Sequence, residues 1–184
     1  MGKIVFIVAS LSMAGLFGLL AVSLSSNTTK SIIVVNEEFG ELLGDNRVVE
    51  DFSLDLFDGG SVKLSDLRGD VVLLDFWSSW CVQCRREAPL LSQIHSEYRG
   101  KGVSFIGINV WDRESDATAY REAFGLTYPS GQDKEGIILL EYGIRGIPEK
   151  LILNKDGRLV RKLVGPSDID TLRLVLDETL KSSG

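Results

Sequence analysis

Two mainly apolar runs with a helical segment between them constrain the fold of this chain more than any other feature. Residues 71–77 (VVLLDFW) and 103–111 (VSFIGINVW) have the length of strands and are apolar at successive positions, as in strands covered on both faces. Residues 85–102 between them carry apolar side chains at helical spacing and end at two glycines. A strand, a helix and a strand without a hairpin turn form a βαβ unit, so we expect two parallel strands.

Two hairpins flank this unit in the sequence. Residues 51–67 alternate apolar and polar side chains on either side of Asp58-Gly59-Gly60, a sequence typical of a tight turn. Residues 150–165 show the same pattern around Asp156-Gly157. Strands joined by tight turns are antiparallel, so the chain predicts a sheet that contains both strand directions.

Three further segments predict helices. Residues 115–125 and 136–143 have short helical patterns, and residues 167–181 carry leucine and isoleucine along one face. Ser167, followed three residues later by Asp170, predicts a capping box at the start of the last helix. Together these elements predict an α/β fold with a central mixed β-sheet flanked by helices.

The N-terminal segment differs in composition from the rest. From Ile4 to Leu24 the chain runs 21 residues without a charge, close to the ~20 residues with which a helix crosses a membrane. Three interpretations stay open: an uncleaved membrane anchor, which we favour, a cleaved signal peptide, and a buried helix. Lys3 ahead of the run favours an N-terminus inside the cytoplasm. We divide the chain into an anchor or signal segment with its linker, residues 1–30, and a globular domain, residues 31–184.

The charge of the chain argues against one class of partner. The net charge is −6, and Lys3 and Lys30 are the only charged residues among the first thirty, so the remainder is more acidic still. An acidic domain without a basic run binds nucleic acids poorly, because their phosphates repel it. We therefore expect no nucleic-acid partner, and a contact with the membrane only through the N-terminal segment.

The only two cysteines, Cys81 and Cys84, have three interpretations. As a structural staple they would close a very short loop, which stabilises a fold by only about 2 kcal/mol. As a metal site they would supply two of the four ligands usual for structural zinc, while the only histidine, His95, lies about 16 Å further along the helix. As a reacting pair they would exchange disulfides.

The reacting pair accounts for more of the surrounding sequence. Cys81 follows a buried strand and begins a helix, where free N–H groups and the helix dipole favour a thiolate. Cys84 lies nearly one turn later on the same face and can attack a mixed disulfide formed at Cys81. Trp80, directly before the pair, shields it partly from water.

At this point the sequence shows a resemblance. Residues 73–89 (LLDFWSSWCVQCRREAP) closely resemble the active-site signature of the thioredoxin superfamily, in the form used by its membrane-anchored TlpA/ResA/DsbE-like branch. Residues 48–77 resemble the entry segment of this branch, and residues 142–160 resemble its segment around a cis-proline. The resemblance implies a thioredoxin-like fold with an N-terminal β-hairpin and a helical insertion ahead of the cis-proline hairpin.

The resemblance also implies roles for individual residues. Asp75 corresponds to the buried acid of thioredoxin that helps to deprotonate the second cysteine; relatives in this branch often have asparagine there, and a structural aspartate is the alternative. Glu87 corresponds to an acid near the cysteines of ResA-like proteins; the alternative is an exposed glutamate in the first turn. Pro148 corresponds to the cis-proline, against an ordinary trans proline. The backbone of Ile147 would then pair with a bound substrate strand, and Trp80 would contribute to the same binding surface.

The implied function is that of a bacterial thiol–disulfide oxidoreductase outside the cytoplasm. The resemblance implies an enzyme tethered to the inner membrane, with its catalytic domain in the periplasm or an equivalent space and no cofactor. It would reduce specific client proteins, with apocytochrome c in cytochrome c biogenesis as the first-ranked client and a copper-site cysteine pair in oxidase assembly as the second. A membrane thiol donor would supply the electrons. The alternative is a non-enzymatic module that carries copper or binds a partner.

Overall fold

The computed structural model describes residues 40–182. The apolar N-terminal run, which we expect to be an anchor or a signal, lies outside these residues. Within residues 40–182, no helix has the length and the apolar character needed to cross a membrane.

A six-stranded sheet forms the centre of the described domain and consists of β1 (Glu41–Leu43), β4 (Val71–Trp77), β5 (Val103–Asn109), β6 (Ser130–Gln132), β7 (Glu149–Leu153) and β8 (Leu159–Val164). The strand order is β1-β8-β7-β4-β5-β6. The pairs β4–β5 and β5–β6 are parallel, whereas β1–β8, β7–β8 and β4–β7 are antiparallel. The sheet is therefore mixed, which confirms the prediction.

The βαβ unit has the connection that the sequence predicts. β4 leads through α2 (Val82–Tyr98) into β5, and the two strands pair along their whole length. All seven residues of β4 are buried, which explains its nearly continuous apolar sequence. Leu74 and Phe76 pack on one face of the sheet, and Leu73 packs on the other.

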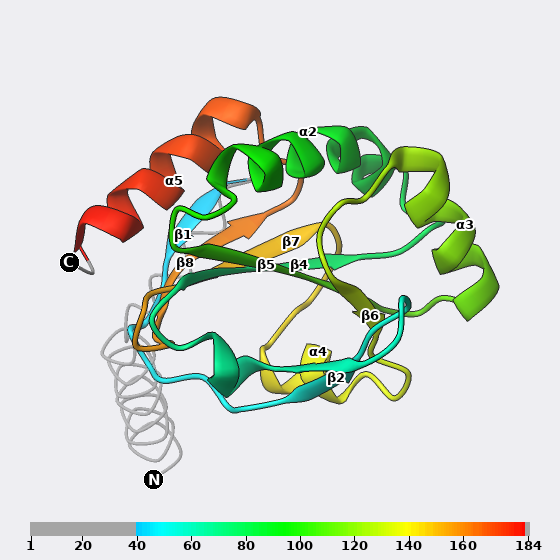
Figure 1. Cartoon of the computed structure of the whole chain (residues 1–184), viewed down its shortest axis with the longest axis horizontal. Helices are drawn as coiled ribbons and strands as arrows, with labels where there is room; N and C mark the ends of the chain where they lie inside the picture. Colours follow the sequence, from blue (N-terminus) through cyan, green and yellow to red (C-terminus); the bar gives the residue numbers. More distant parts are fainter. Residues whose placement is uncertain (1–39, 183–184) are drawn as a thin grey trace, which may run out of the picture. The chain divides into compact units, whose positions relative to one another are not determined.

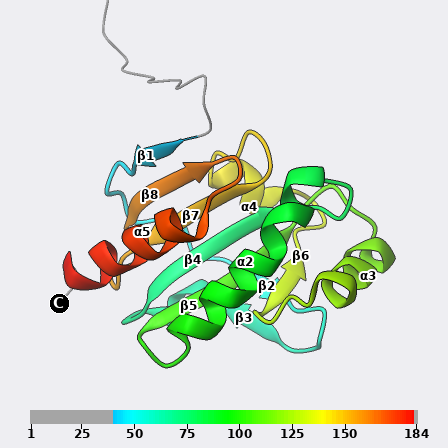
Figure 2. The same ribbon diagram turned by 90° about the horizontal axis from the view of Figure 1, so that it is seen from above.

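Helices cover the two faces of the sheet unequally. α2 and α5 (Ile169–Ser182) lie side by side over one face, as Figures 1 and 2 show. The other face is covered by α4 (Ile137–Glu141), the hairpin of β2 (Ser53–Asp55) and β3 (Ser61–Lys63), and the short helix η1 (Leu64–Leu67) that follows it (Figure 1). The fold therefore has a two-sided core, with apolar side chains from both layers packed on the sheet.

The segment between β5 and β7 holds the expected insertion. It contains α3 (Glu114–Phe124), β6 and α4. α3 packs against the first turns of α2, where the Tyr120 hydroxyl donates to the Cys84 carbonyl at 2.9 Å. This insertion therefore supplies one wall of the region around the cysteines.

Two strands and one helix cap differ from what the sequence predicts. β1 and β6 are only three residues long and lack an alternating pattern, so no sequence signal marked them. The predicted capping box of Ser167 and Asp170 is wrong, because α5 begins at Ile169 and Asp168 caps it, accepting from the Thr171 N–H at 2.8 Å. The Ser167 N–H instead donates to the Glu87 carboxylate at 2.9 Å.

Candidate active site

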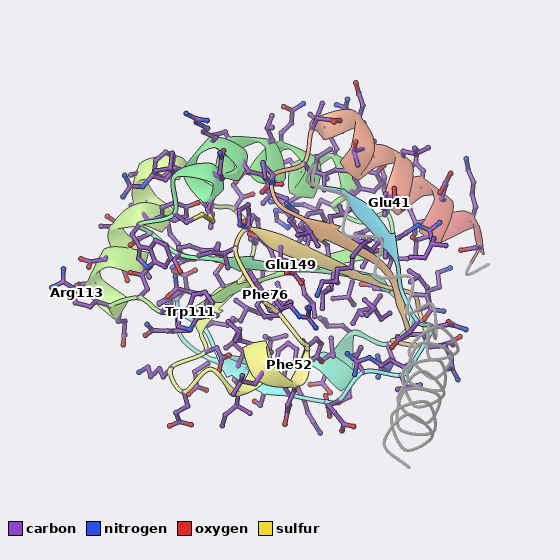
Figure 3. The ribbon with its side chains drawn as sticks, turned by 180° about the vertical axis from the view of Figure 1, so that it is seen from behind. Glu41, Phe52, Phe76, Trp111, Arg113 and Glu149 are labelled. Atoms are coloured by element: carbon purple, nitrogen blue, oxygen red, sulfur yellow. A yellow bond between two sulfur atoms is a disulfide. The ribbon has the colours of Figure 1, made fainter. Side chains whose placement is uncertain are left out.

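Cys81 and Cys84 form a disulfide at the start of α2, which Figure 3 shows as a yellow bond. Cys81 is the N-cap of the helix, and its Sγ accepts from the Cys84 N–H at 3.1 Å. A backbone N–H that points at this sulfur would also stabilise a thiolate there. Cys81 is 6 % exposed to solvent and Cys84 is 3 % exposed. The pair therefore lies just below the surface, and Cys81 is its more accessible member.

The loop ahead of the pair is held by hydrogen bonds to the segment after β5. The Ser79 N–H and hydroxyl donate to the two Asp112 carboxylate oxygens at 2.6 and 2.8 Å, and the buried Ser78 hydroxyl donates to the Val110 carbonyl. Arg85 Nε donates back to the Ser79 carbonyl at 2.6 Å. These bonds fix the backbone from which Cys81 projects. No motif in the sequence marks Asp112 as part of the site.

Trp80, directly before Cys81, is largely open to solvent. Its side chain is 54 % exposed, and its Nε1 donates to the Trp111 carbonyl at 3.0 Å. Trp111, which Figure 3 labels in the segment between β5 and α3, is 53 % exposed and has a φ of 53°. Val82, the residue after Cys81, is 59 % exposed. Three apolar side chains thus reach solvent close to the pair, and two of them were not anticipated.

Asp75 is buried in the middle of β4. The Tyr128 hydroxyl donates to Oδ2 at 2.8 Å, while Oδ1 has no hydrogen-bond partner among the described residues. Burial, reinforced by the Glu87 carboxylate, raises the pKa of Asp75 to about 7, against the opposing effects of Lys150 and Tyr128. Asp75 can therefore gain or lose a proton near neutral pH, as a general acid or base must.

Glu87 lies inside the protein, so the alternative interpretation as an exposed first-turn glutamate is wrong. Its Oε1 forms a 2.5 Å ion pair with the fully buried Lys150 and accepts from the Ser167 N–H. Lys150 Nζ also donates to the Gly165 carbonyl at 2.6 Å. Lys150 is not predicted from the sequence, although a lysine directly before the apolar residues LIL of a strand is a usable signal. It is the register partner of Asp75 on the neighbouring strand.

Ile147 and Pro148 lie directly ahead of β7. The Ile147–Pro148 peptide bond is cis, as expected. Ile147 is half-buried and packs against the cluster that contains both cysteines. Pro148 precedes β7 directly, and its carbonyl accepts from the Gly165 N–H at 2.9 Å. The strand that directly follows the cis-proline therefore holds Lys150.

The region around the cysteines offers little to a metal. Within residues 40–182, no group of three or more histidine, cysteine, aspartate or glutamate side chains is arranged to hold an ion. His95 packs its ring against Phe105 and Tyr128 and has Nδ1 2.9 Å from the Thr127 hydroxyl. Partial burial, with Arg99 nearby, lowers the pKa of His95. His95 is a packing residue away from the disulfide.

Known proteins resemble this chain in sequence and in fold. A model of the AhpC/TSA family matches residues 46–162. The thiol-disulfide oxidoreductase ResA of Geobacillus thermodenitrificans is 32% identical over 115 residues, which are 62% of this chain and 66% of that protein. The chain thus spans just under two thirds of this relative.

Solved structures give the same picture. The secreted thiol-disulfide isomerase of Corynebacterium glutamicum superposes with a TM-score of 0.72 at 26% identity, over 80% of this chain and 95% of that one. A Chlorobium tepidum protein described as a thiol:disulfide interchange protein DsbE superposes with a TM-score of 0.68 at 29% identity, over 77% of this chain and 99% of that one. These similarities confirm the thioredoxin-like fold and the ResA/DsbE-like resemblance. Since the family model covers well over half of the sequence, this chain belongs to the AhpC/TSA family.

Proposed function

We propose that this protein is a thiol–disulfide oxidoreductase that exchanges disulfides with client proteins through Cys81 and Cys84. The observation that carries the proposal is the position of the pair at the N-terminus of a helix, with Cys81 the more accessible member. Relatives named as thiol-disulfide oxidoreductase and isomerase support it.

In the reducing direction, the reaction starts from the dithiol. The Cys81 thiolate attacks one sulfur of a client disulfide, forms a mixed disulfide and releases the other client sulfur as a thiolate. Cys84 loses its proton, attacks the Cys81 sulfur and releases the second client thiolate. Two electrons have then passed to the client, and the protein is left with the Cys81–Cys84 disulfide that the structure contains. An external thiol donor must reduce it again.

Two groups support these steps chemically. The N-terminus of α2 and the Cys84 N–H stabilise negative charge on Cys81, which makes it the better nucleophile and the better leaving group. Asp75 is the group that we propose takes the proton of Cys84. The Asp75 carboxylate raises the pKa of Tyr120, whose hydroxyl donates to the Cys84 carbonyl, and this electrostatic interaction supports the proposal.

The surface beside the disulfide is suited to an extended client segment. Ile147 and Pro148 precede the strand β7, and we propose that the backbone of Ile147 pairs with the client strand that carries its cysteine. Trp80 would pack against the apolar side chains of that strand, because its indole is half exposed and held in place by its bond to the Trp111 carbonyl.

For the setting, we propose an extracytoplasmic domain tethered by the N-terminal segment, residues 1–30. The charge-free run from Ile4 to Leu24 and the likeness to ResA support this. Apocytochrome c is our first-ranked client and an oxidase copper-site cysteine pair the second, both on the family resemblance. A membrane thiol donor would return the electrons.

The direct test is reduction of insulin by dithiothreitol, catalysed by the full-length protein in mild detergent. We expect turnover by the wild type and none by Cys81→Ser. A wild type without exchange activity that retains copper through dialysis would instead establish a copper-binding module. Cys84→Ser, expressed in cells, should remain covalently joined to its client, and mass spectrometry of that adduct identifies the client.

A kinetic prediction concerns Asp75. When the reduced protein reacts with stoichiometric dithiobis(nitrobenzoate), the first nitrobenzoate thiolate reports attack by Cys81 and the second reports ring closure by Cys84. We expect Asp75→Asn to slow the second release at least tenfold and the first much less, because the carboxylate serves Cys84. Equal slowing of both releases would contradict this role.

A further inference from the structure

Three buried charged side chains meet in the layer between α2 and the sheet. Asp75 of β4 and Lys150 of β7 are direct partners in the antiparallel register, and Glu87 reaches them from α2. Cross-strand partners have Cβ atoms about 5 Å apart, so Lys150 lies within electrostatic reach of Asp75 as well as in contact with Glu87. The cluster therefore holds two carboxyl groups and one ammonium group.

Lys150 connects this charge to the active-site helix. Its ammonium donates to Glu87, which is three residues beyond Cys84 in α2, and to the Gly165 carbonyl in the connection to α5. Glu87 Oε2 and Asp75 Oδ1 are both buried without a hydrogen-bond partner among the described residues. Because Asp75 Oδ1 has no donor of its own among the described residues, the balance of neighbouring charges affects how readily Asp75 takes up a proton.

Lys150 and Glu87 act on Asp75 in opposite directions. The Lys150 ammonium lowers the pKa of Asp75, and the Glu87 carboxylate raises it. Among the described residues, Tyr128 and Tyr120 of α3 also interact electrostatically with Asp75 and Glu87, and Arg85 of α2 interacts with Tyr120. Burial raises the pKa of both tyrosines above their usual range, so they stay neutral near pH 7. Arg85 is exposed and bonded to Ser79, so the buried positive charge comes from Lys150.

We propose that Lys150 is a positioning residue for disulfide exchange, whose ammonium neutralises Glu87 and sets the pH at which Asp75 accepts the proton of Cys84. The proposal rests on the proposed function. Lys150 touches no sulfur and forms no bond with the client. It acts on the second step, in which the proton of the Cys84 thiol passes to Asp75 while the Cys84 sulfur displaces the client thiolate.

The test measures the pH dependence of the two releases from dithiobis(nitrobenzoate), with full-length reduced protein in detergent. Lys150→Met keeps the length of the side chain and removes its charge. We expect the pH midpoint of the second release to rise by about one unit or more, because an opposite charge at this range lowers the pKa of a carboxyl by about that amount. Below both midpoints, the second release should therefore be about tenfold slower.

Adding Glu87→Gln to Lys150→Met removes the matching negative charge as well. If Lys150 acts through Glu87, the midpoint of this double variant returns toward the wild-type value. If Lys150→Met does not fold, the double variant is compared with Glu87→Gln, whose amide oxygen can still accept from Lys150. The double variant should then have the higher midpoint, because it alone lacks the buried cation.

Lys162→Met is the matched control. Lys162 forms an ion pair with a buried glutamate, Glu149, and donates to a glycine carbonyl, as Lys150 does. Glu149 is the register partner of Phe76, and both are labelled in Figure 3 on the face opposite α2. This variant should lose stability but keep the wild-type midpoint of the second release.

Three outcomes would overturn the proposal. They are an unchanged midpoint in Lys150→Met, a double variant shifted as far as Lys150→Met, and an equal shift in Lys162→Met. A wild type that releases no second thiolate would refute the proposed function instead. A role of Lys150 in stability alone would change the free energy of unfolding without moving the midpoint.

Discussion

At the scale of single residues, the unusual feature of this protein is how much charge it buries beside a redox pair. Buried carboxylates are costly unless they are paired. Only one Asp75 carboxylate oxygen accepts a hydrogen bond from a described residue, the Tyr128 hydroxyl. Glu87 is paired with Lys150, but it leaves one oxygen without a partner among the described residues. A fold that only needed stability would gain from apolar side chains here, so the cost points to use in the reaction.

Burial of the ionised Asp75 carboxylate should lower the free energy of unfolding at neutral pH. Its folded pKa of about 7 lies above the ordinary value of 3.8, so the folded state binds more protons than the unfolded state between these two pH values. The stability of the wild type therefore falls as the pH rises from about 4 to about 7. Asp75→Asn lacks this loss, so we expect the variant to be more stable than the wild type above pH 7, by up to about 4 kcal/mol.

Urea denaturation of the oxidised protein at several pH values measures this difference. The difference in the free energy of unfolding between Asp75→Asn and the wild type should shrink toward zero near pH 4. A stability difference that is the same at pH 4 and pH 8 would show that the substitution acts through packing or hydrogen bonds rather than through the carboxylate.

At the scale of elements, the connections rather than the strands position the reactive pair. The segment after β5 holds the loop ahead of Cys81 through Asp112, and it places Trp111 beside Trp80. The connection from β8 to α5 contributes the Ser167 N–H and the Gly165 carbonyl to the Glu87–Lys150 pair. Connections carry site residues in many folds because they tolerate irregular backbone.

Trp111 has a left-handed backbone, which costs a non-glycine residue about 1–2 kcal/mol, and its side chain is half exposed. We expect Trp111→Gly to raise the free energy of unfolding by about 1 kcal/mol, or leave it unchanged, because glycine adopts this backbone freely. If the indole contacts clients, insulin reduction should become slower while reaction with dithiobis(nitrobenzoate) stays the same. Equal loss in both assays would mean that Trp111 supports the loop only.

Two substitutions test which residue caps the N-terminus of α5. Asp168→Ala removes the side chain that accepts from Thr171, and should lower the free energy of unfolding by about 1 kcal/mol. Ser167→Ala should change it by much less, because Ser167 uses its backbone N–H, which alanine retains. Thermal unfolding of the two variants checks this. A larger loss of stability in Ser167→Ala than in Asp168→Ala would show that Ser167 is the capping residue.

At the scale of the whole molecule, the sequence was sufficient for most of the architecture but not for two short strands of the sheet or for the interior of the site. The βαβ unit, both hairpins and the last helix carry patterns that repeat over many residues, and all are present. β1 and β6 form by pairing with strands that are distant in the sequence. Each is only three residues long, which is too short to show a strand pattern. Lys150 and Glu87 are 63 positions apart, and only the fold brings them together. Cys81 and Cys84 were found because the short motif around them is local, and Pro148 was found through the family resemblance of residues 142–160.

The whole molecule also determines the direction in which electrons flow. A protein that reduces its clients must be stabilised by its own disulfide relative to the dithiol, whereas an oxidant of the DsbA kind is more stable when reduced. We therefore expect the oxidised protein to unfold at a higher urea concentration than the reduced protein. Unfolding with and without dithiothreitol measures this, and a Cys81→Ser/Cys84→Ser variant should give one midpoint in both. A reduced form more stable than the oxidised form would reverse the proposed direction, because the folded chain would then favour giving up its disulfide to a client.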